Sequence, residues 1–138
     1  RFDSVAAWPG HILGVGTVGG DEDGKGGIPI FCLPGDPVSA QVCFEVFVRP
    51  ALRHMQGWTQ LTRPSVKAAV DRAWYSPRGR REFVRVRLDP RNGYQAKVMG
   101  APASLLLSAL AESNALAVVP EATTNVRVGD MLQCLVLE

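Results

Sequence analysis

The sequence lacks a strong excess of charge, because 15 Lys and Arg residues face 13 Asp and Glu residues, which leaves a net charge of +2. This balance argues against binding to nucleic acid or to a membrane surface through bulk charge. No apolar run approaches the ~18 to 20 residues needed to cross a bilayer. With 138 residues, 46% of them hydrophobic, the chain is typical of a globular protein with one domain or two small units.

Cysteine is also scarce, with three residues that form no closely spaced pair: Cys32, Cys43 and Cys134. An odd number without a CxxC motif is typical of free thiols rather than paired ones. We therefore expect buried free thiols in a reducing compartment, with the cytoplasm as the location. The first residues resemble neither a signal nor a transit peptide. Because the chain starts without Met, we expect it to be a piece of a longer protein.

The most informative segment runs from Ile28 to Ser39. An apolar run stops at Pro34-Gly35-Asp36-Pro37, and a segment with helical apolar periodicity follows at once. Pro34 favours an extended residue before it, and Gly35 suits backbone angles that other residues avoid. Asp36 is a good N-cap, and Pro37 then falls at the first helical position, where its missing N–H costs nothing. The pattern predicts a strand, a sharp turn and a helix start.

Such a turn presents backbone N–H groups at the positive end of a helix, which suits a bound anion. The two prolines donate nothing, so the donors would come from Gly35, Asp36, Val38 and Ser39. The alternative is a well-capped helix that binds nothing. Local chemistry taken alone favours that structural alternative, because helix caps are common without a ligand.

The first part of the chain is predicted to form strands followed by one helix. Its segments are a strand over 2–8, an extended segment over 11–18, an exposed Gly-rich loop over 19–27 and an antiparallel strand over 28–33. Helical periodicity then runs from Val38 to about Met55, with Pro50 expected to kink or divide the helix and Gly57 to cap it. The GxGxxG match at residues 14–19 precedes no helix, so a dinucleotide site is not favoured.

The remainder reads as a linker over 58–64 and then mostly strands. These strands are expected over 65–74, 82–88, 94–99, 115–119 and 131–137, with turns at 90–93 and 129–130 and one short helix over 104–113. In the strand over 82–88, Val84, Val86 and Leu88 share one face, whereas Phe83, Arg85 and Arg87 share the other. Six arginines between Arg78 and Arg91 read better as a solvated surface than as a nucleic-acid site.

These residues support a family resemblance. The blocks Ile28–Phe31, Leu33–Ala40, Phe44-Glu45 and Val48–Leu52 resemble the molybdopterin molybdenumtransferase family, which includes bacterial molybdenum-insertion enzymes and the E domain of gephyrin. Weaker matches at Val5–Gly10, Gly79–Phe83 and Ser108–Leu116 extend the resemblance in order over nearly the whole chain. The resemblance implies an α/β fragment over 1–57, the end of a molybdopterin-binding domain. A linker over 58–64 and a small β-barrel-like C-terminal domain with one helix over 65–138 would follow.

The resemblance also implies an activity, namely insertion of molybdate into adenylylated molybdopterin with Mg²⁺ and release of AMP. The full-length protein would be a homodimer that binds a small pterin and neither nucleic acid nor membrane. The family's active-site turn carries over onto the following substrate-binding candidates: Pro34, Gly35, Asp36, Pro37 and Ser39, with Arg80 and Arg81 as further candidates. Asp36 stands where the family usually has Asn, so it is a candidate catalytic residue or Mg²⁺ ligand.

Two further positions depart from the family pattern, and one alternative function stays open. Cys32 replaces a common Gly, where we expect it to pack, and His11 replaces a Lys that is frequent in the family. The family's other active-site residues come from an earlier part of the domain, so we expect this chain alone to be inactive. The alternative is a non-catalytic pterin-binding or scaffold module, which would need an exposed apolar groove lined by Phe44, Phe47 or Trp58.

Overall fold

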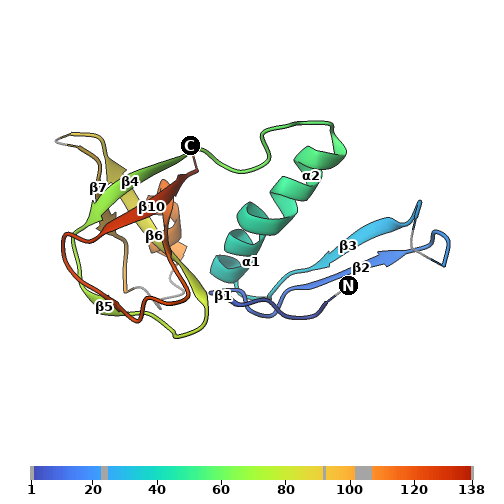
Figure 1. Cartoon of the computed structure of the whole chain (residues 1–138), viewed down its shortest axis with the longest axis horizontal. Coiled ribbons are helices and arrows are strands. Elements are labelled where there is room, and N and C mark those ends of the chain that lie inside the picture. Colours follow the sequence, from blue (N-terminus) through green and yellow to red (C-terminus); the bar gives the residue numbers. More distant parts are fainter. Residues whose placement is uncertain (1, 23–24, 92, 102–106, 138) are drawn as a thin grey trace.

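The computed structural model describes residues 2–22, 25–91, 93–101 and 107–137. Figure 1 shows three parts in a row: a two-stranded hairpin, a long helix and a β-barrel. The helix stands between the hairpin and the barrel, so both the turn before it and the barrel end near it can contribute to one site. The predicted fold class, an α/β fragment followed by a small barrel with one helix, is confirmed.

The hairpin pairs β2 (Gly14–Val18) with β3 (Ile28–Cys32) in antiparallel register, as predicted. The connecting loop contains glycines with positive φ at positions 19, 20 and 26. The prediction of one strand over residues 2–8 is wrong, because its two ends have different partners. Phe2 forms an isolated bridge with Val15, whereas β1 (Ala7–Trp8) pairs with a barrel strand.

The helix continues through three segments: α1 (Pro37–Cys43), the π-helical η1 (Phe44–Val48) and α2 (Arg49–Met55). The Arg49 N–H bonds to the carbonyl of Phe44, five residues back. This wider turn lies directly before Pro50, whose ring would otherwise clash with the carbonyl four residues earlier. Pro50 therefore widens the helix rather than dividing it. Gly57, at φ +81° with its N–H bonded to the His54 carbonyl, ends it as predicted.

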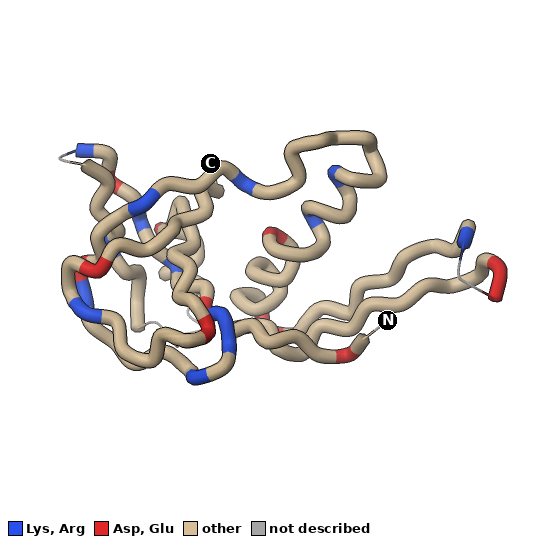
Figure 2. The backbone as a smooth tube through the Cα atoms, viewed as in Figure 1, with Lys and Arg blue, Asp and Glu red and all other residues tan. Residues whose placement is uncertain are grey.

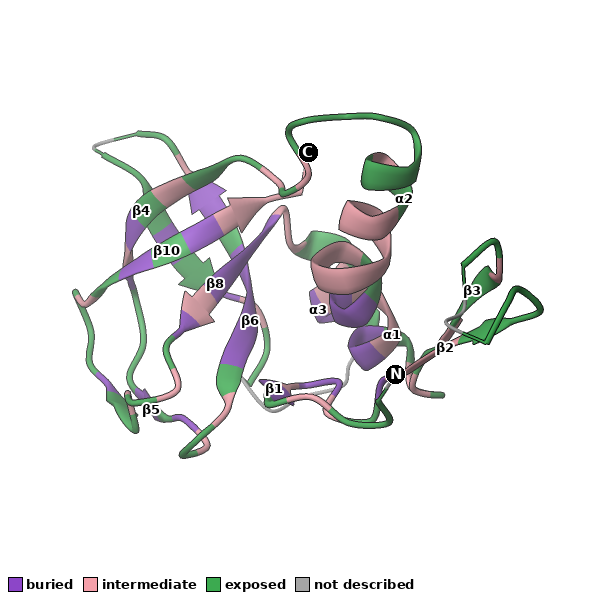
Figure 3. Ribbon diagram, turned by 45° about the vertical axis from the view of Figure 1, so that its right-hand side comes forward, coloured by how far each residue is buried: buried purple, intermediate pink, exposed green. Residues whose placement is uncertain are grey.

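The apolar face of the helix is buried only near its N-terminus. Val42 and Cys43 are fully buried, whereas Met55 is 63% exposed. The last turn of α2 therefore leaves its part of the apolar face open to solvent. In Figure 3 this gradient appears as purple on α1 and green on α2.

The barrel consists of β4 (Ser65–Val70), β6 (Arg81–Asp89), β7 (Gln95–Val98), β8 (Ala115–Val119) and β10 (Met131–Val136). The order β6-β7-β4-β10-β8 is closed by pairing of β6 with β8. The β4–β7 pair is parallel and the other pairs are antiparallel, so the barrel is mixed. A short ribbon of β5 (Trp74–Tyr75) and β9 (Asn125–Val126) lies beside it. The helix α3 (Leu107–Glu112) matches the end of the predicted one, whose residues 104–106 lie outside the described residues.

Strand β6 is buried on both faces, which the sequence did not predict. Val84 and Val86 fill the barrel, as expected from their alternation. On the other face, Phe83 packs with Val42 of α1 and with Ala7 of β1, and Arg85 is only 2% exposed. The prediction of a solvated arginine surface is therefore wrong for Arg85, and Phe83 on the same face packs against α1 and β1.

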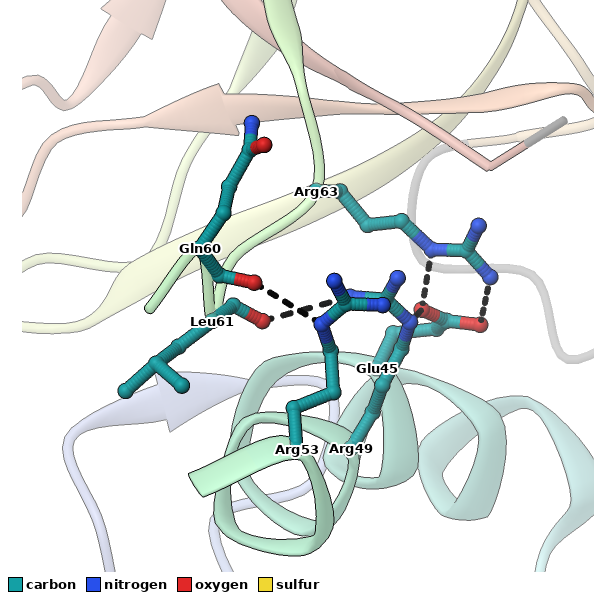
Figure 4. Close-up of polar contacts among 6 residues, drawn as sticks. All are labelled: Glu45, Arg49, Arg53, Gln60, Leu61 and Arg63. Carbon is teal, nitrogen blue, oxygen red and sulfur yellow. Dashed lines mark hydrogen bonds and ion pairs between the residues drawn. The ribbon is translucent and has the colours of Figure 1, made fainter. Parts of the chain in front are cut away.

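Two connections join the helix and hairpin to the barrel. Strand β1 pairs in parallel with β6, with Ala7 opposite Arg81 and Trp8 opposite Glu82. Residues 58–64 contain no helix or strand, but arginines hold them to the helix (Figure 4). Arg63 makes a bidentate contact with Glu45 at 2.8 and 3.0 Å, and Arg53 Nε donates to the Gln60 carbonyl at 2.8 Å.

The division at 58–64 stays a prediction, since β1 lies before it in sequence and in the barrel sheet in space. None of the helices in the described residues is long and apolar enough to span a membrane.

Candidate functional site

The turn before the helix is capped as predicted. Asp36 has extended backbone angles, and its Oδ1 accepts a hydrogen bond from the Ser39 amide at 2.8 Å, while Pro37 occupies the first helical position. That bond uses the Ser39 N–H, so the prediction that it is a free donor is wrong. Gly35 does not have positive φ, and a Cβ placed there would meet nothing within 4 Å. The chain therefore turns without the special angles predicted for Gly35.

A second segment, residues 8–12, packs against the same end of the helix. Gly10 has φ +100°, and its carbonyl accepts a hydrogen bond from the Cys43 Sγ at 3.4 Å. A Cβ on Gly10 would lie 2.6 Å from that sulfur, so the close approach requires glycine. Burial, assisted by the negative charge of Asp36, raises the pKa of the Cys43 thiol to about 11, so the thiol stays protonated and serves packing.

These two segments enclose a small cavity of about 130 Å³, lined by residues that include Trp8, Gly10, His11, Pro34, Asp36 and Ser39. This volume is below the ~300 to 1,000 Å³ of typical small-molecule sites. It suits a small anion or the end of a larger ligand rather than a complete pterin. The structure thus places Pro34, Asp36 and Ser39 together with His11.

The two candidate arginines lie in different surroundings. The Arg80 guanidinium stands 5.9 Å from the centroid of the Trp8 ring, and that ring stacks with His11 at 5.9 Å between centroids. Arg81 pairs instead with Glu121 at 3.0 Å and lines other cavities. Neither arginine lines the cavity at the Asp36 turn, but Arg80 lies near Trp8, which does. Their roles as substrate-binding residues stay predictions.

A buried cation faces the turn from the barrel. Burial lowers the pKa of the Arg85 guanidinium, and the negative charge of Asp36 opposes that shift. The carboxylate at position 36 is thus partly balanced by a charge on β6. Arg85 was not among the residues predicted from the sequence, because strand alternation placed it on a solvated face.

The other arginines of residues 78–91 agree with a structural reading. Arg81 and Arg91 pair with acidic residues, and the Arg87 guanidinium donates to the Glu112 carbonyl. Figure 2 shows blue and red positions interspersed along the barrel. Within the described part of these strands, positive and negative side chains are therefore mixed rather than gathered into a strip of one sign.

The three cysteines differ in burial, and the described residues form no cluster of metal ligands. Cys43 and Cys134 are buried free thiols, as predicted, but Cys32 is exposed, so its predicted packing role is wrong. It lies at the end of β3, in a hairpin that forms a separate two-stranded sheet. Within the described ranges, no group of three or more His, Cys, Asp or Glu residues could hold a metal ion.

An apolar groove of about 480 Å³ separates the helix from the barrel, but its lining differs from the prediction. It includes Val46, Phe83, Val118 and Leu135. Phe44 and Trp58 do not line it, and both are exposed, with the Arg53 guanidinium 4.4 Å from the centroid of the Trp58 ring. Phe47 borders a neighbouring cavity of about 270 Å³.

Comparison with known families matches both parts of the chain. Residues 67–137 match the family described as the MoeA C-terminal region (domain IV). Residues 1–54 match the family described as a probable molybdopterin binding domain. The boundary between the two matches falls near the arginine-held segment.

Individual relatives agree. The chain is 43% identical over 133 residues to molybdopterin molybdenumtransferase 2 of Mycobacterium tuberculosis, covering 96% of this chain and 31% of the relative. It is 31% identical over 117 residues to gephyrin of Dictyostelium discoideum, covering 78% of this chain and 16% of gephyrin. The crystal structure of the molybdopterin biosynthesis MoeA protein from Pyrococcus horikoshii aligns with a TM-score of 0.78 at 30% identity, covering 98% of this chain and 32% of that one.

The chain thus spans about a third of the length of its molybdenumtransferase relatives. Matches in both parts, in the same order and with the same barrel, agree with the resemblance carried by the Pro34–Pro37 turn. The chain belongs to the MoeA family of molybdopterin molybdenumtransferases.

Proposed function

We propose that this chain acts in molybdenum cofactor biosynthesis, as part of an enzyme that inserts molybdate into adenylylated molybdopterin and releases AMP. The observation that carries the proposal is the cavity where the Asp36 turn meets the Trp8–His11 segment. The names of the relatives support the reaction, and the cavity supports its place in this chain.

In this proposal the cavity holds an anionic group, either molybdate or the pterin phosphate. Pro34 and Ser39 border that group, and the Arg80 guanidinium lies 5.9 Å from the centroid of the Trp8 ring, which also lines the cavity. Fixed groups of this kind lower the cost of bringing two anionic reactants together. Asp36 works against the anion because like charges repel, and Arg85 reduces that penalty.

A resident Mg²⁺ fits these residues poorly. Asp36 is the carboxylate that lines the cavity, and its Oδ1 already accepts from the Ser39 amide. Magnesium is commonly held by one or two carboxylates together with substrate phosphates and water. Mg²⁺ would therefore arrive with the phosphate rather than reside on this chain.

A cytoplasmic homodimer is also part of the proposal for the full-length protein.

Calorimetry with adenylylated molybdopterin tests the binding site. We expect the chain to bind it, and we expect Asp36→Asn to bind about tenfold more tightly, because the change removes a like charge while Asn still caps the helix. The matched control is Asp89→Asn, the same substitution at the C-terminal end of β6 and outside the cavity lining. It should leave the affinity for adenylylated molybdopterin unchanged. Absence of binding by both the chain and Asp36→Asn would contradict the proposal.

The reaction is tested separately by measuring AMP release in the presence of molybdate. We expect none from this chain alone, because it spans about a third of the length of its molybdenumtransferase relatives. Molybdenum insertion by the isolated chain would overturn that part of the proposal.

The apolar groove supports a second candidate function, a non-catalytic scaffold. Its lining is mostly apolar and lies between helix and barrel, although not at the residues first predicted. A chain that binds no pterin yet binds an apolar peptide at Val118 and Leu135 would favour this candidate.

A further inference from the structure

A larger cavity lies on the barrel side of Trp8. Its volume is about 470 Å³, within the usual range for small-molecule sites, and its lining includes Trp8, Trp74, Tyr75, Ser76, Pro77 and Glu82. Trp8 also lines the cavity at the Asp36 turn, so the two cavities share this residue. Figure 3 shows β1 and β5, which carry these tryptophans, at the same end of the barrel.

Two buried polar side chains belong to this larger cavity. Glu82 is 2% exposed, and its Oε2 accepts a hydrogen bond from the Trp74 indole at 2.9 Å. Ser76 is 6% exposed, and its hydroxyl has no hydrogen-bond partner among the described residues. Buried polar groups are normally satisfied, and a buried carboxylate with one neutral donor is costly. Both groups therefore have unused capacity toward a ligand.

The arrangement around Glu82 favours a flat ligand. Parallel pairing places Trp8 beside Glu82 on neighbouring strands, and Trp74 contacts the same carboxylate from β5. Aromatic side chains provide flat apolar surfaces against which a ring can pack. Arg80 lies 5.9 Å from the centre of the Trp8 ring. Its positive charge suits a phosphate carried by a substituent of the bound ligand.

The polar groups narrow the class of ring. A carboxylate accepts two parallel N–H donors, and a hydroxyl can donate to a neighbouring carbonyl. An aminopyrimidinone edge presents these groups in a row: an amino group, a ring N–H and a carbonyl. Pterins and guanine share that edge. Adenine has a ring nitrogen acceptor where the N–H is needed, and this acceptor would face the carboxylate.

We propose that this cavity binds the aminopyrimidinone ring of a pterin, with Glu82 accepting its N–H groups, Ser76 donating to its carbonyl and Arg80 facing its phosphate. The choice of pterin over guanine rests on the proposed function, whereas the recognition chemistry does not. The ligand's substituent would pass Trp8 toward the Asp36 turn, where the anionic group is expected.

Binding of pterin, GMP and AMP to the full chain tests this site, followed by quenching of tryptophan fluorescence and by calorimetry. We expect pterin to bind and AMP not to bind. Glu82→Gln should weaken pterin binding about tenfold, because an amide has one acceptor oxygen and cannot accept two parallel N–H groups side by side, and Ser76→Ala about threefold. The matched control is Glu121→Gln on the barrel surface, which should leave pterin affinity unchanged.

Thermal melting of each variant shows whether it remains folded, and Ser76→Ala provides a mild test if Glu82→Gln does not fold. Pterin binding that is tighter than GMP binding supports both the site and its link to the proposed function. Tighter GMP binding supports the recognition chemistry and assigns it to a guanine nucleotide. Equal binding of AMP, or a pterin affinity unchanged in both variants, overturns the site even if adenylylated molybdopterin binds at the Asp36 turn.

Discussion

The barrel and the hairpin are built from similar apolar residues but bury them differently. The barrel closes through β6–β8 pairing, and its core side chains are almost completely buried. The hairpin is two-stranded, and Ile28 and Val18 in it are 71% and 58% exposed. A barrel has no free edges, whereas an isolated hairpin is marginally stable in water. The site lies between these regions, on the end of the helix that the barrel covers.

The largest expected effect tests that difference with one residue type. Leu132→Ala, in the barrel core at 7% exposure, should lower the free energy of unfolding by about 2–5 kcal/mol. Leu52→Ala, on α2 at 44% exposure, should cost less than about 1 kcal/mol. Urea denaturation of the two variants measures both changes. If both variants lowered the free energy of unfolding equally, the difference in burial between the barrel core and α2 would not determine their contributions to stability.

The next effect concerns the helix cap at the site. Asp36→Ala should cost about 1 kcal/mol because it removes the acceptor for the Ser39 amide. Asp36→Asn should leave the stability within a few tenths of a kcal/mol of the unmodified chain, because Asn caps about as well. Thermal or urea unfolding distinguishes the two. If Asp36→Asn lowered the stability as much as Asp36→Ala, the charge of Asp36, acting toward Arg85, would stabilise the fold.

A smaller effect is expected where residues 58–64 are held to the helix. Arg63→Ala removes the bidentate contact with Glu45 and should cost about 0.5 kcal/mol after solvent screening. The same variant should speed limited proteolysis within residues 58–64. Arg91→Ala, which breaks the exposed pair with Asp89, is the control and should change neither quantity. Proteolysis at an unchanged rate would mean that the arginines do not hold this segment.

The smallest effect on stability at neutral pH comes from the thiols. Burial raises the pKa of Cys43 and Cys134 from 9.0 to about 11. Their contribution to stability is complete below about pH 9 and is lost as the pH rises toward 11, because unfolding then releases protons. At pH 8 a thiol reagent should modify Cys32 rapidly and the other two only after unfolding. Rapid reaction of all three in the folded chain would contradict their burial.

Local signals predicted local structure well. Asp36 and Pro37 specify the helix start by chemistry within a few residues, and Gly57 specifies its end. Long-range contacts explain the failures. Phe83 packs against α1 and β1, and Arg85 on the same face of β6 is buried, but periodicity within one strand carries no information about which face another element covers.

The candidate site was predicted in part for the same reason. The Pro34–Ser39 turn could be recognised from consecutive residues, but its neighbours Trp8 and His11 arrive from a distant segment. Glu82 was read as the first residue of a strand, and only the parallel register of β1 with β6 places it beside Trp8. Arg80 and Arg81 are adjacent in sequence, and only the pairing of Arg81 with Glu121 separates their surroundings.

Backbone amide NMR of the chain titrated with adenylylated molybdopterin tests the central claim most directly, because it locates binding residue by residue. We expect the largest shifts at Gly10, His11, Asp36 and Ser39, which line the cavity between the turn and the segment of residues 8–12. Shifts concentrated instead on the apolar groove, at Val118 and nearby residues, would contradict that claim.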